Sequence, residues 1–230
     1  MKINILHMIE GAKQAEGLTV IIDVFRAFSL ECYLHDMGVK AIRPVGTIEE
    51  AFRLHEIIPD SVLVGERGGK KCEGFDYGNS PSSVSPEHVA GKTIIHTTSA
   101  GTQGIVNAQN ASEIITGSLV NAKAIVEYIK AKNPEIVSIV AMGTAGTRTN
   151  PEDELCAEYL KTMLEGHEMA DIEERIADLR TNGGEHFFNP DTQEIFPEPD
   201  FWMCIKHDLF PFVIQIQKDE LGFIAVKQPV

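Results

Sequence analysis

The sequence is poor in cysteine, and its four cysteines have no motif spacing. Cys32, Cys72, Cys156 and Cys204 lie far apart and include no CxxC pair. This spacing excludes a zinc ribbon and argues against a disulfide framework. We therefore expect reduced thiols, with Cys32 and Cys156 buried in helices.

Long apolar runs are also missing. No stretch approaches the ~18 consecutive apolar residues of a membrane span. The N-terminal segment MKINILHMIEG has a short apolar run broken by His7 and Glu10, which is too short for a signal-peptide core and favours a strand. We expect a cytoplasmic protein that does not bind membranes.

Positive charge is scarce, because 20 Lys and Arg face 34 Asp and Glu, for a net charge of −14. Such a surface repels nucleic acid and anionic membranes, so neither is an expected partner. The cations are nevertheless concentrated in loops that follow predicted strands. Five of them lie there: Arg26, Arg67, Lys70, Lys71 and Arg148. These loops suit a small anionic ligand.

What the chain does contain is a regular alternation of strands and helices in 230 residues, of which 43% are hydrophobic. Strands are predicted at 2–8, 18–23, 40–45, 61–65, 92–97, 113–117 and 135–141. Helices are predicted at 27–37, 47–57, 101–110, 121–132, 151–165 and 167–180. This alternation indicates a three-layer α/β/α fold with a mostly parallel sheet.

The C-terminal part follows a different pattern. Residues 182–200 read as a loop or an irregular turn, and 210–217 and 222–228 flank the turn KDEL as a β-hairpin. An antiparallel hairpin added to a parallel core makes a mixed sheet. We treat residues 1–230 as a single α/β domain in which 166–230 form a C-terminal extension.

Acidic residues stand where buried strands end. Asp23 and Glu66 each terminate an apolar run, and we expect them on neighbouring strand ends, at the edge where open α/β folds bind ligands. Oxygen ligands of this kind suit Mg²⁺. Asp76, Asn79 and Ser80 add oxygen groups from the long loop 66–86, although Asx turns that merely hold the loop would also use them.

The segment TTSAGTQG follows a strand and opens a helix. Its backbone N–H groups at Gly101 and the hydroxyls of Thr98, Ser99 and Thr102 can hold a phosphate. It has neither the GK[ST] ending of a Walker loop nor the GxGxxG pattern. The alternative is an ordinary capped helix start with a tight turn.

The helix 151–165 begins with three acids after a capping Asn150. Acids in a first turn ordinarily offset the helix dipole. Glu152 and Asp153 share the apolar side of this helix, whereas Glu154 lies on the solvent face with Glu158. A metal or substrate role is therefore predicted for Glu152 and Asp153 alone.

Several familiar chemistries are absent. The eight histidines show no HExxH spacing. Phe25 stands where a phosphoaspartate enzyme needs a second acid after Asp23. Gly78 stands where a cysteine phosphatase needs an arginine after Cys72.

Taken together, DVFRAFS, GERGG…GFDYGNSP, TTSAGTQGI, GSLVNA and MGTAGTRTNPEDELCAEYL resemble the 2-phosphosulfolactate phosphatase family of coenzyme M biosynthesis. The resemblance runs from about residue 18 to residue 165, and the tail joins it more loosely through PDFWMCIKHDLFPFV. It implies a magnesium-dependent hydrolase that converts (R)-2-phospho-3-sulfolactate to 3-sulfolactate and phosphate.

The resemblance and the residue patterns together nominate a site. The catalytic candidates are Asp23, Arg26, Arg67, Ser99 and Arg148. The substrate-binding candidates are Asn79, Ser80, Thr98, Gly101 and Thr102. The Mg²⁺ candidates are Asp23, Glu66, Asp76, Glu152 and Asp153.

Two alternatives remain at this point. One is a phosphatase of another small phosphorylated hydroxy acid, and the other is a non-catalytic binder of an anionic metabolite. The paired acids at strand ends favour catalysis, since an anion receptor has little use for them. The expected partner is the small anionic substrate, and a homodimer is left open.

Overall fold

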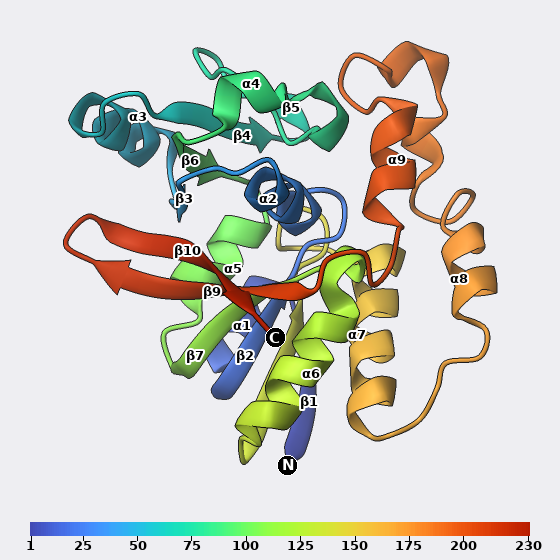
Figure 1. Ribbon diagram of the computed structural model, residues 1–230. Coiled ribbons are helices and arrows are strands. Elements are labelled where there is room, and N and C mark those ends of the chain that lie inside the picture. The colour runs from blue at the N-terminus through green and yellow to red at the C-terminus, as the bar shows by residue number, and fades with distance from the viewer.

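The computed structural model describes residues 1–230 and contains one ten-stranded sheet (Figure 1). The strand order is β1-β8-β2-β7-β9-β10-β3-β6-β4-β5. The strands are β1 (Lys2–His7), β2 (Gly17–Ile22), β3 (Ala41–Pro44), β4 (Val62–Arg67), β5 (Lys70–Lys71), β6 (Thr93–Thr97), β7 (Ala111–Gly117), β8 (Ile136–Ala141), β9 (Phe212–Asp219) and β10 (Gly222–Pro229). The predicted α/β class and mixed sheet are confirmed.

Helices cover both faces of this sheet because its strands are apolar on both sides. In β2, Val20 and Ile22 pack into one core with α6 and α7, and Ile21 packs into the other with α2 and α5. This two-sided burial is typical of strands in parallel sheets. The helices are α1 (Met8–Gln14), α2 (Ala27–Asp36), α3 (Ile48–Ile57), α4 (Pro86–Val89), α5 (Gly101–Asn107), α6 (Ala122–Lys132), α7 (Pro151–Leu164), α8 (Ile172–Asp178) and α9 (Glu198–Cys204).

Side-chain caps fix the first residues of α3 and α7, two helices that the sequence predicted. The Thr47 hydroxyl accepts a hydrogen bond from the backbone N–H of Glu50 at 3.1 Å. The side-chain oxygen of Asn150 accepts one from the backbone N–H of Asp153, also at 3.1 Å. The sequence reasoning missed α1, because seven residues that include a glycine are too few to show a helical period. Gly11 in this helix packs against Leu6 of β1.

The C-terminal hairpin occupies the centre of the sheet. β9 pairs with β7 and β10 pairs with β3, so the hairpin joins one parallel group, β1-β8-β2-β7, to a second, β3-β6-β4. Phe212, Val213 and Ile214 are accordingly buried. The sequence predicted the hairpin itself but treated it as part of an extension, whereas it is the element that makes the sheet continuous.

The sheet bends sharply where the hairpin meets the second parallel group. Only Ala225 and Ile42 pair between β10 and β3. Figure 1 shows β4 and β6 running across the direction of β2 and β7. This bend lets strand ends from both groups contribute to one pocket.

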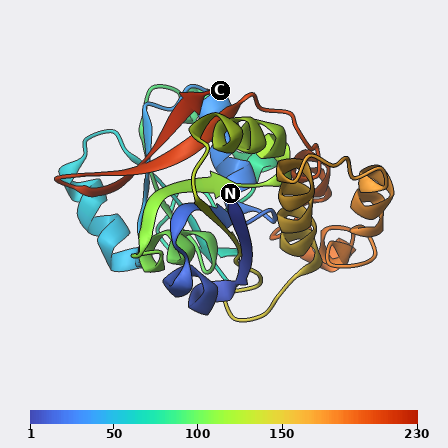
Figure 2. The ribbon, with the colours of Figure 1, turned by 90° about the horizontal axis from the view of Figure 1, so that it is seen from below.

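Residues 165–211 form a separate layer of short helices beside α7, which Figure 2 shows at one side of the sheet. Phe187 and Phe201 from this layer are buried in the core that α6 and α7 share. The predicted helix 167–180 is shorter, at Ile172–Asp178. All four cysteines are free and buried; burial was predicted for Cys32 and Cys156 only. None of the helices combines the length and apolarity that crossing a membrane requires.

Candidate active site

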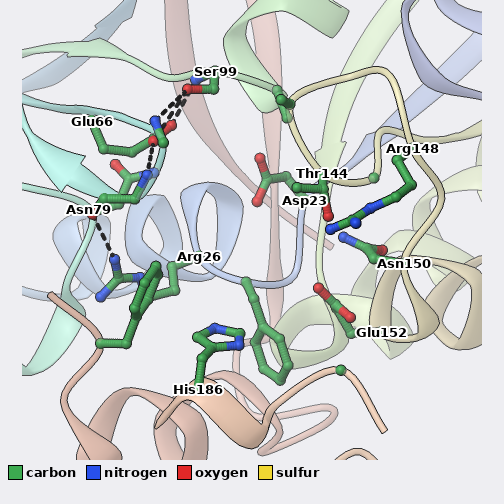
Figure 3. Close-up of a pocket in the computed structure, with 18 of the residues that line it drawn as sticks. Asp23, Arg26, Glu66, Asn79, Ser99, Thr144, Arg148, Asn150, Glu152 and His186 are labelled. Carbon is green, nitrogen blue, oxygen red and sulfur yellow. Dashed lines mark hydrogen bonds between the residues drawn. The ribbon is translucent and has the colours of Figure 1, made fainter. Parts of the chain in front are cut away.

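A pocket of about 580 Å³ opens where the two parallel groups and the C-terminal layer meet (Figure 3). Its wall carries three buried acids, Asp23, Glu66 and Glu152. In Figure 3, Glu66 lies on one side of the pocket and Glu152 on the other, with Asp23 between them. The predicted residues that line it are Asp23, Arg26, Glu66, Asn79, Ser99, Arg148 and Glu152.

Asp23 sits between the N-termini of two helices. Its Oδ1 accepts a hydrogen bond from Ala27 N–H at 3.1 Å, at the start of α2, and its Oδ2 accepts one from Gly101 N–H at 2.9 Å, at the start of α5. Burial raises the pKa of Asp23 to about 6, the negative charge of Glu66 adds to that rise, and the two N–H donors oppose it. The carboxyl group is thus held rigidly at the end of β2.

Glu66 is tied to the same helix start. Its Oε1 accepts from Ser99 N–H at 2.6 Å, and its Oε2 accepts from Gly69 N–H at 2.7 Å and from the Ser99 hydroxyl at 3.2 Å. β2 and β4 are not neighbours in the sheet, so the prediction that Asp23 and Glu66 lie on adjacent strand ends is wrong. The turn Ser99–Gly101 joins the two acids instead, because Ser99 N–H donates to Glu66 and Gly101 N–H donates to Asp23.

Arg26 is buried, and Asp200 neutralises its charge. Its Nη1 donates to Asp200 Oδ2 at 2.6 Å, and its guanidinium lies 5.0 Å from the centroid of the Phe196 ring. Asp200 also accepts hydrogen bonds from the Ser80 hydroxyl and from Ser82 N–H. Ser80 therefore lies behind Arg26 rather than in the pocket wall, and it helps to hold Asp200 in place.

Arg148 has the opposite environment. It lies at the exposed end of the loop between β8 and α7, and its guanidinium makes no hydrogen bond or ion pair with the protein. Figure 3 shows it on the same side of the pocket as Asn150 and Glu152. Unlike Arg26, Arg148 therefore has all of its N–H donors available for a ligand.

Glu152 is the acid with the fewest partners. It is 4% exposed, and its Oε2 is buried without a hydrogen bond. Burial raises its pKa well above the usual range, and the neighbouring Asp153 raises it further. Glu152 thus lines the pocket with a carboxyl group of which one buried oxygen lacks a partner, and such a group is suited to a proton or a metal ion.

Asp153, one residue later, points elsewhere. Its Oδ1 accepts from Val24 N–H and its Oδ2 from Gly143 N–H, both at 2.8 Å. It does not line the pocket. Asp153 thus ties the loop after β2 to the loop after β8, which favours a structural role over the predicted metal contact.

Two further predicted residues lie outside the pocket. Arg67 follows Glu66 in β4, so its side chain points to the opposite face, where it donates to the carbonyl of Glu66 and to Thr97 Oγ1. Asp76 is exposed and accepts from Leu63 N–H, near the beginning of β4, because the loop folds back along the strand.

The hydroxyls of the TTSAGTQG turn face inward. Thr98 and Thr102 bond to each other's backbone N–H groups and are almost fully buried. Gly101 N–H already binds Asp23. The anion at this helix start is therefore the protein's own carboxylate, and only Ser99 and Ala100 of the turn reach the pocket.

The C-terminal layer supplies wall residues that the sequence reasoning missed. Gly183, Glu185, His186 and Phe196 line the pocket. Burial lowers the pKa of His186, and the nearby Arg26 lowers it further. The length of the predicted loop 182–200 could have pointed to them, since ordered loops of that length are usually functional.

Comparison with known proteins decides the family. The model of the 2-phosphosulpholactate phosphatase family matches residues 4–219. This chain belongs to that family. Its members are phosphoric monoester hydrolases, so this chain is a phosphatase of that family.

Individual members of the 2-phosphosulfolactate phosphatase family support the assignment. A probable 2-phosphosulfolactate phosphatase of Bacillus subtilis (strain 168) is 31% identical over 204 residues, which cover 88% of each chain. One from Clostridium acetobutylicum is 37% identical over 164 residues, covering 70% of this chain and 69% of the relative. One from Caldicellulosiruptor saccharolyticus is 44% identical over 149 residues, covering 63% and 61%.

The pocket of this phosphatase contains carboxylates that could bind a metal ion. No group of three or more His, Cys, Asp or Glu side chains converges closely enough to form a complete ligand cage. The pocket instead offers separate carboxylates, one of which has an unpartnered buried oxygen. That set fits Mg²⁺, which ordinarily takes one or two carboxylates and completes its shell with water and substrate phosphate.

Proposed function

We propose that this phosphatase hydrolyses (R)-2-phospho-3-sulfolactate to 3-sulfolactate and phosphate, and that the reaction depends on Mg²⁺. The names of its relatives and the charges in the pocket support this proposal. The substrate carries a phosphate, a carboxylate and a sulfonate on three carbons, so it needs several cationic contacts in a small volume.

The charges of the residues that line the pocket support a bound metal ion. The cations are Arg26 and Arg148, of which Arg26 is already paired with Asp200. Asp23 and Glu66 add negative charge to the same wall, and Glu152 adds more when it is deprotonated. A multiply charged anion would be repelled from this pocket unless a further cation accompanied it.

Mg²⁺ would be held by one or two of the carboxylates of Asp23, Glu66 and Glu152, because no three acids converge on one point. When bound, the ion would offset charge that develops on a phosphoryl oxygen. Two of these carboxylates are already oriented by backbone N–H groups, and the third is buried and lacks a partner. Rigid positioning of this kind lowers the cost of reorganisation during the reaction.

The remaining residues bind and orient the substrate. Arg148 has a free planar fork that matches any of the three oxyanions. Arg26 is fixed by Asp200 and by the Phe196 ring, so it presents a pre-oriented cation. Burial and the nearby Arg26 lower the pKa of His186, which favours the neutral imidazole, and this side chain in the wall could exchange a proton with water or with the leaving group.

Phosphate release tests the proposal. Purified protein is treated with EDTA and assayed with 2-phospho-3-sulfolactate, with and without added Mg²⁺. Turnover that EDTA abolishes and Mg²⁺ restores is expected. Full activity in metal-free protein would contradict the metal requirement.

The same assay with phosphoglycolate and phospholactate separates the alternatives. Preference for one of these esters would assign the pocket to another small phosphorylated hydroxy acid. Ligand-induced thermal stabilisation without turnover of any ester would indicate a binder.

A further inference from the structure

A chain of three buried polar side chains leads from the interior to the pocket wall. His96 Nδ1, on β6, lies 2.8 Å from Glu31 Oε1, on α2, and His96 Nε2 lies 2.9 Å from Asn79 Oδ1. Glu31 and His96 are fully buried, and Asn79 is 4% exposed. Of the three, only Asn79 lines the pocket.

The amide oxygen of Asn79 fixes the direction of one of these two hydrogen bonds. An amide oxygen only accepts, so His96 Nε2 carries a proton that it donates to Asn79 Oδ1. The contact between His96 Nδ1 and Glu31 Oε1 requires a second proton, on either atom. Both placements leave the Glu31–His96 pair without net charge, as its complete burial requires.

This arrangement determines which end of the Asn79 amide the pocket receives. Its oxygen is held inward by His96, so its NH₂ group is the end that faces the pocket. The NH₂ group makes no hydrogen bond with the protein. Two free N–H donors in a pocket wall suit an anionic oxygen, whereas the reversed amide would present a repelling acceptor.

We propose that Glu31 and His96 are positioning residues that hold the Asn79 amide in the orientation that donates to a substrate oxyanion. The inference rests on the proposed function only in requiring a phosphate-bearing ligand. Neither Glu31 nor His96 lines the pocket, so both would act on a ligand only through Asn79.

A double-mutant cycle tests the coupling. We measure the Kd of inorganic phosphate by calorimetry, with Mg²⁺ present, and kcat and KM for 2-phospho-3-sulfolactate. Asn79→Ala should raise the Kd and KM about 10-fold, the loss expected for one hydrogen bond to a charged group, with a smaller change in kcat. His96→Leu should raise them in the same direction, and in the Asn79→Ala background it should add nothing.

A matched control isolates the effect of burial. His35 on α2 is also a buried histidine, and it does not line the pocket. His35→Leu should change the melting temperature without changing Kd or KM. Additive losses for His96→Leu and Asn79→Ala would show that His96 only stabilises the fold, and would overturn the proposal.

Two further measurements do not depend on the folding of His96→Leu. In ¹⁵N-histidine spectra of the wild-type protein, His96 Nε2 should be protonated at neutral pH, and an unprotonated Nε2 would overturn the proposal. Asn79→Asp keeps the contact with His96 but places negative charge in the wall, so it should weaken phosphate binding more than Asn79→Ala does. An equal or smaller effect would overturn it.

The outcomes also separate this inference from the proposed function. If wild-type protein binds phosphate but does not hydrolyse 2-phospho-3-sulfolactate, the substrate assignment fails while the cycle in Kd still decides the role of His96. If wild-type protein binds no phosphate, both fail.

Discussion

Three consecutive acids at the start of α7 have three different environments. Glu152 is buried in the pocket wall with an unpartnered oxygen, whereas both oxygens of Asp153 accept backbone N–H groups. Glu154 is about one-third exposed and contacts His7. Neutralising each in turn therefore probes a metal contact, a structural link and a surface pair.

Glu152→Gln should leave the melting temperature unchanged or raise it, since it removes an unpaired buried carboxyl. It should also lower turnover and raise the Mg²⁺ concentration that gives half activity. Asp153→Asn should instead cost about 1–3 kcal/mol of stability, because its NH₂ would face a buried backbone N–H. Glu154→Gln is the control and should do neither. Magnesium titrations and thermal melts of all three variants check this, and identical titrations would remove Glu152 from the metal site.

The two pocket arginines should also behave differently. Arg148→Ala should raise KM about 10-fold or more with an unchanged melting temperature, because the side chain is exposed and binds nothing in the protein. Arg26→Ala should lower stability by about 3–5 kcal/mol, since it leaves the buried Asp200 unpaired. Denaturant unfolding and steady-state kinetics check both. A stable, active Arg26→Ala variant would contradict the assigned role.

At the scale of elements, the C-terminal layer is held against the loop after β4. Gly69 has φ +82°, and a Cβ there would overlap the Phe196 ring. Gly69→Ala should therefore displace the wall that carries Phe196 and reduce kcat/KM. Gly38→Ala is a matched control, because Gly38 has φ +81° but no atom within 4 Å of an added Cβ. Both variants should pay about 1–2 kcal/mol for the left-handed backbone, and only Gly69→Ala should lose activity. Equal activities would show that the contact does not shape the pocket.

For the whole molecule, buried acids should make stability depend on pH. Burial raises the pKa of Asp23 from 3.8 to about 6 and that of Asp153 from 3.8 to about 8. The folded state thus keeps protons that the unfolded state releases above about pH 4, and stability falls as pH rises from about 4 to about 8. In EDTA, the melting temperature should drop across this range, and Asp23→Asn should flatten the drop. Added Mg²⁺ should stabilise the protein more at pH 8 than at pH 5. A melting temperature that rises with pH in EDTA would contradict this.

The central hairpin yields a second prediction at this scale. Deleting residues 212–230 removes β9 and β10 from between the two parallel groups, so the truncated chain should show no cooperative unfolding transition. Calorimetry and circular dichroism check this. Ile214→Ala, within the same hairpin, should keep the fold and cost about 2–5 kcal/mol. A truncated chain that unfolds cooperatively would show that the hairpin is only an attachment.

Local pattern alone determined much of this protein. Periodicity predicts the alternating strands and helices and the burial of Cys32 and Cys156. Capping chemistry predicts the Asn150 and Thr47 caps, and strand ends mark Asp23 and Glu66 as candidate acids. The difference between Glu152 and Glu154 was also predictable, because residues two apart in a helix face different sides.

Tertiary structure decided the rest, because it depends on contacts between residues far apart in the chain. Only the fold places the hairpin between two parallel groups and brings Asp23 and Glu66 to one turn across non-adjacent strands. The same long-range contacts pair Arg26 with Asp200, 174 residues away, and turn the hydroxyls of Thr98 and Thr102 inward. Sequence identifies which side chains can do chemistry, whereas packing selects which of them face the pocket, since each partner competes with the substrate for the same hydrogen bonds.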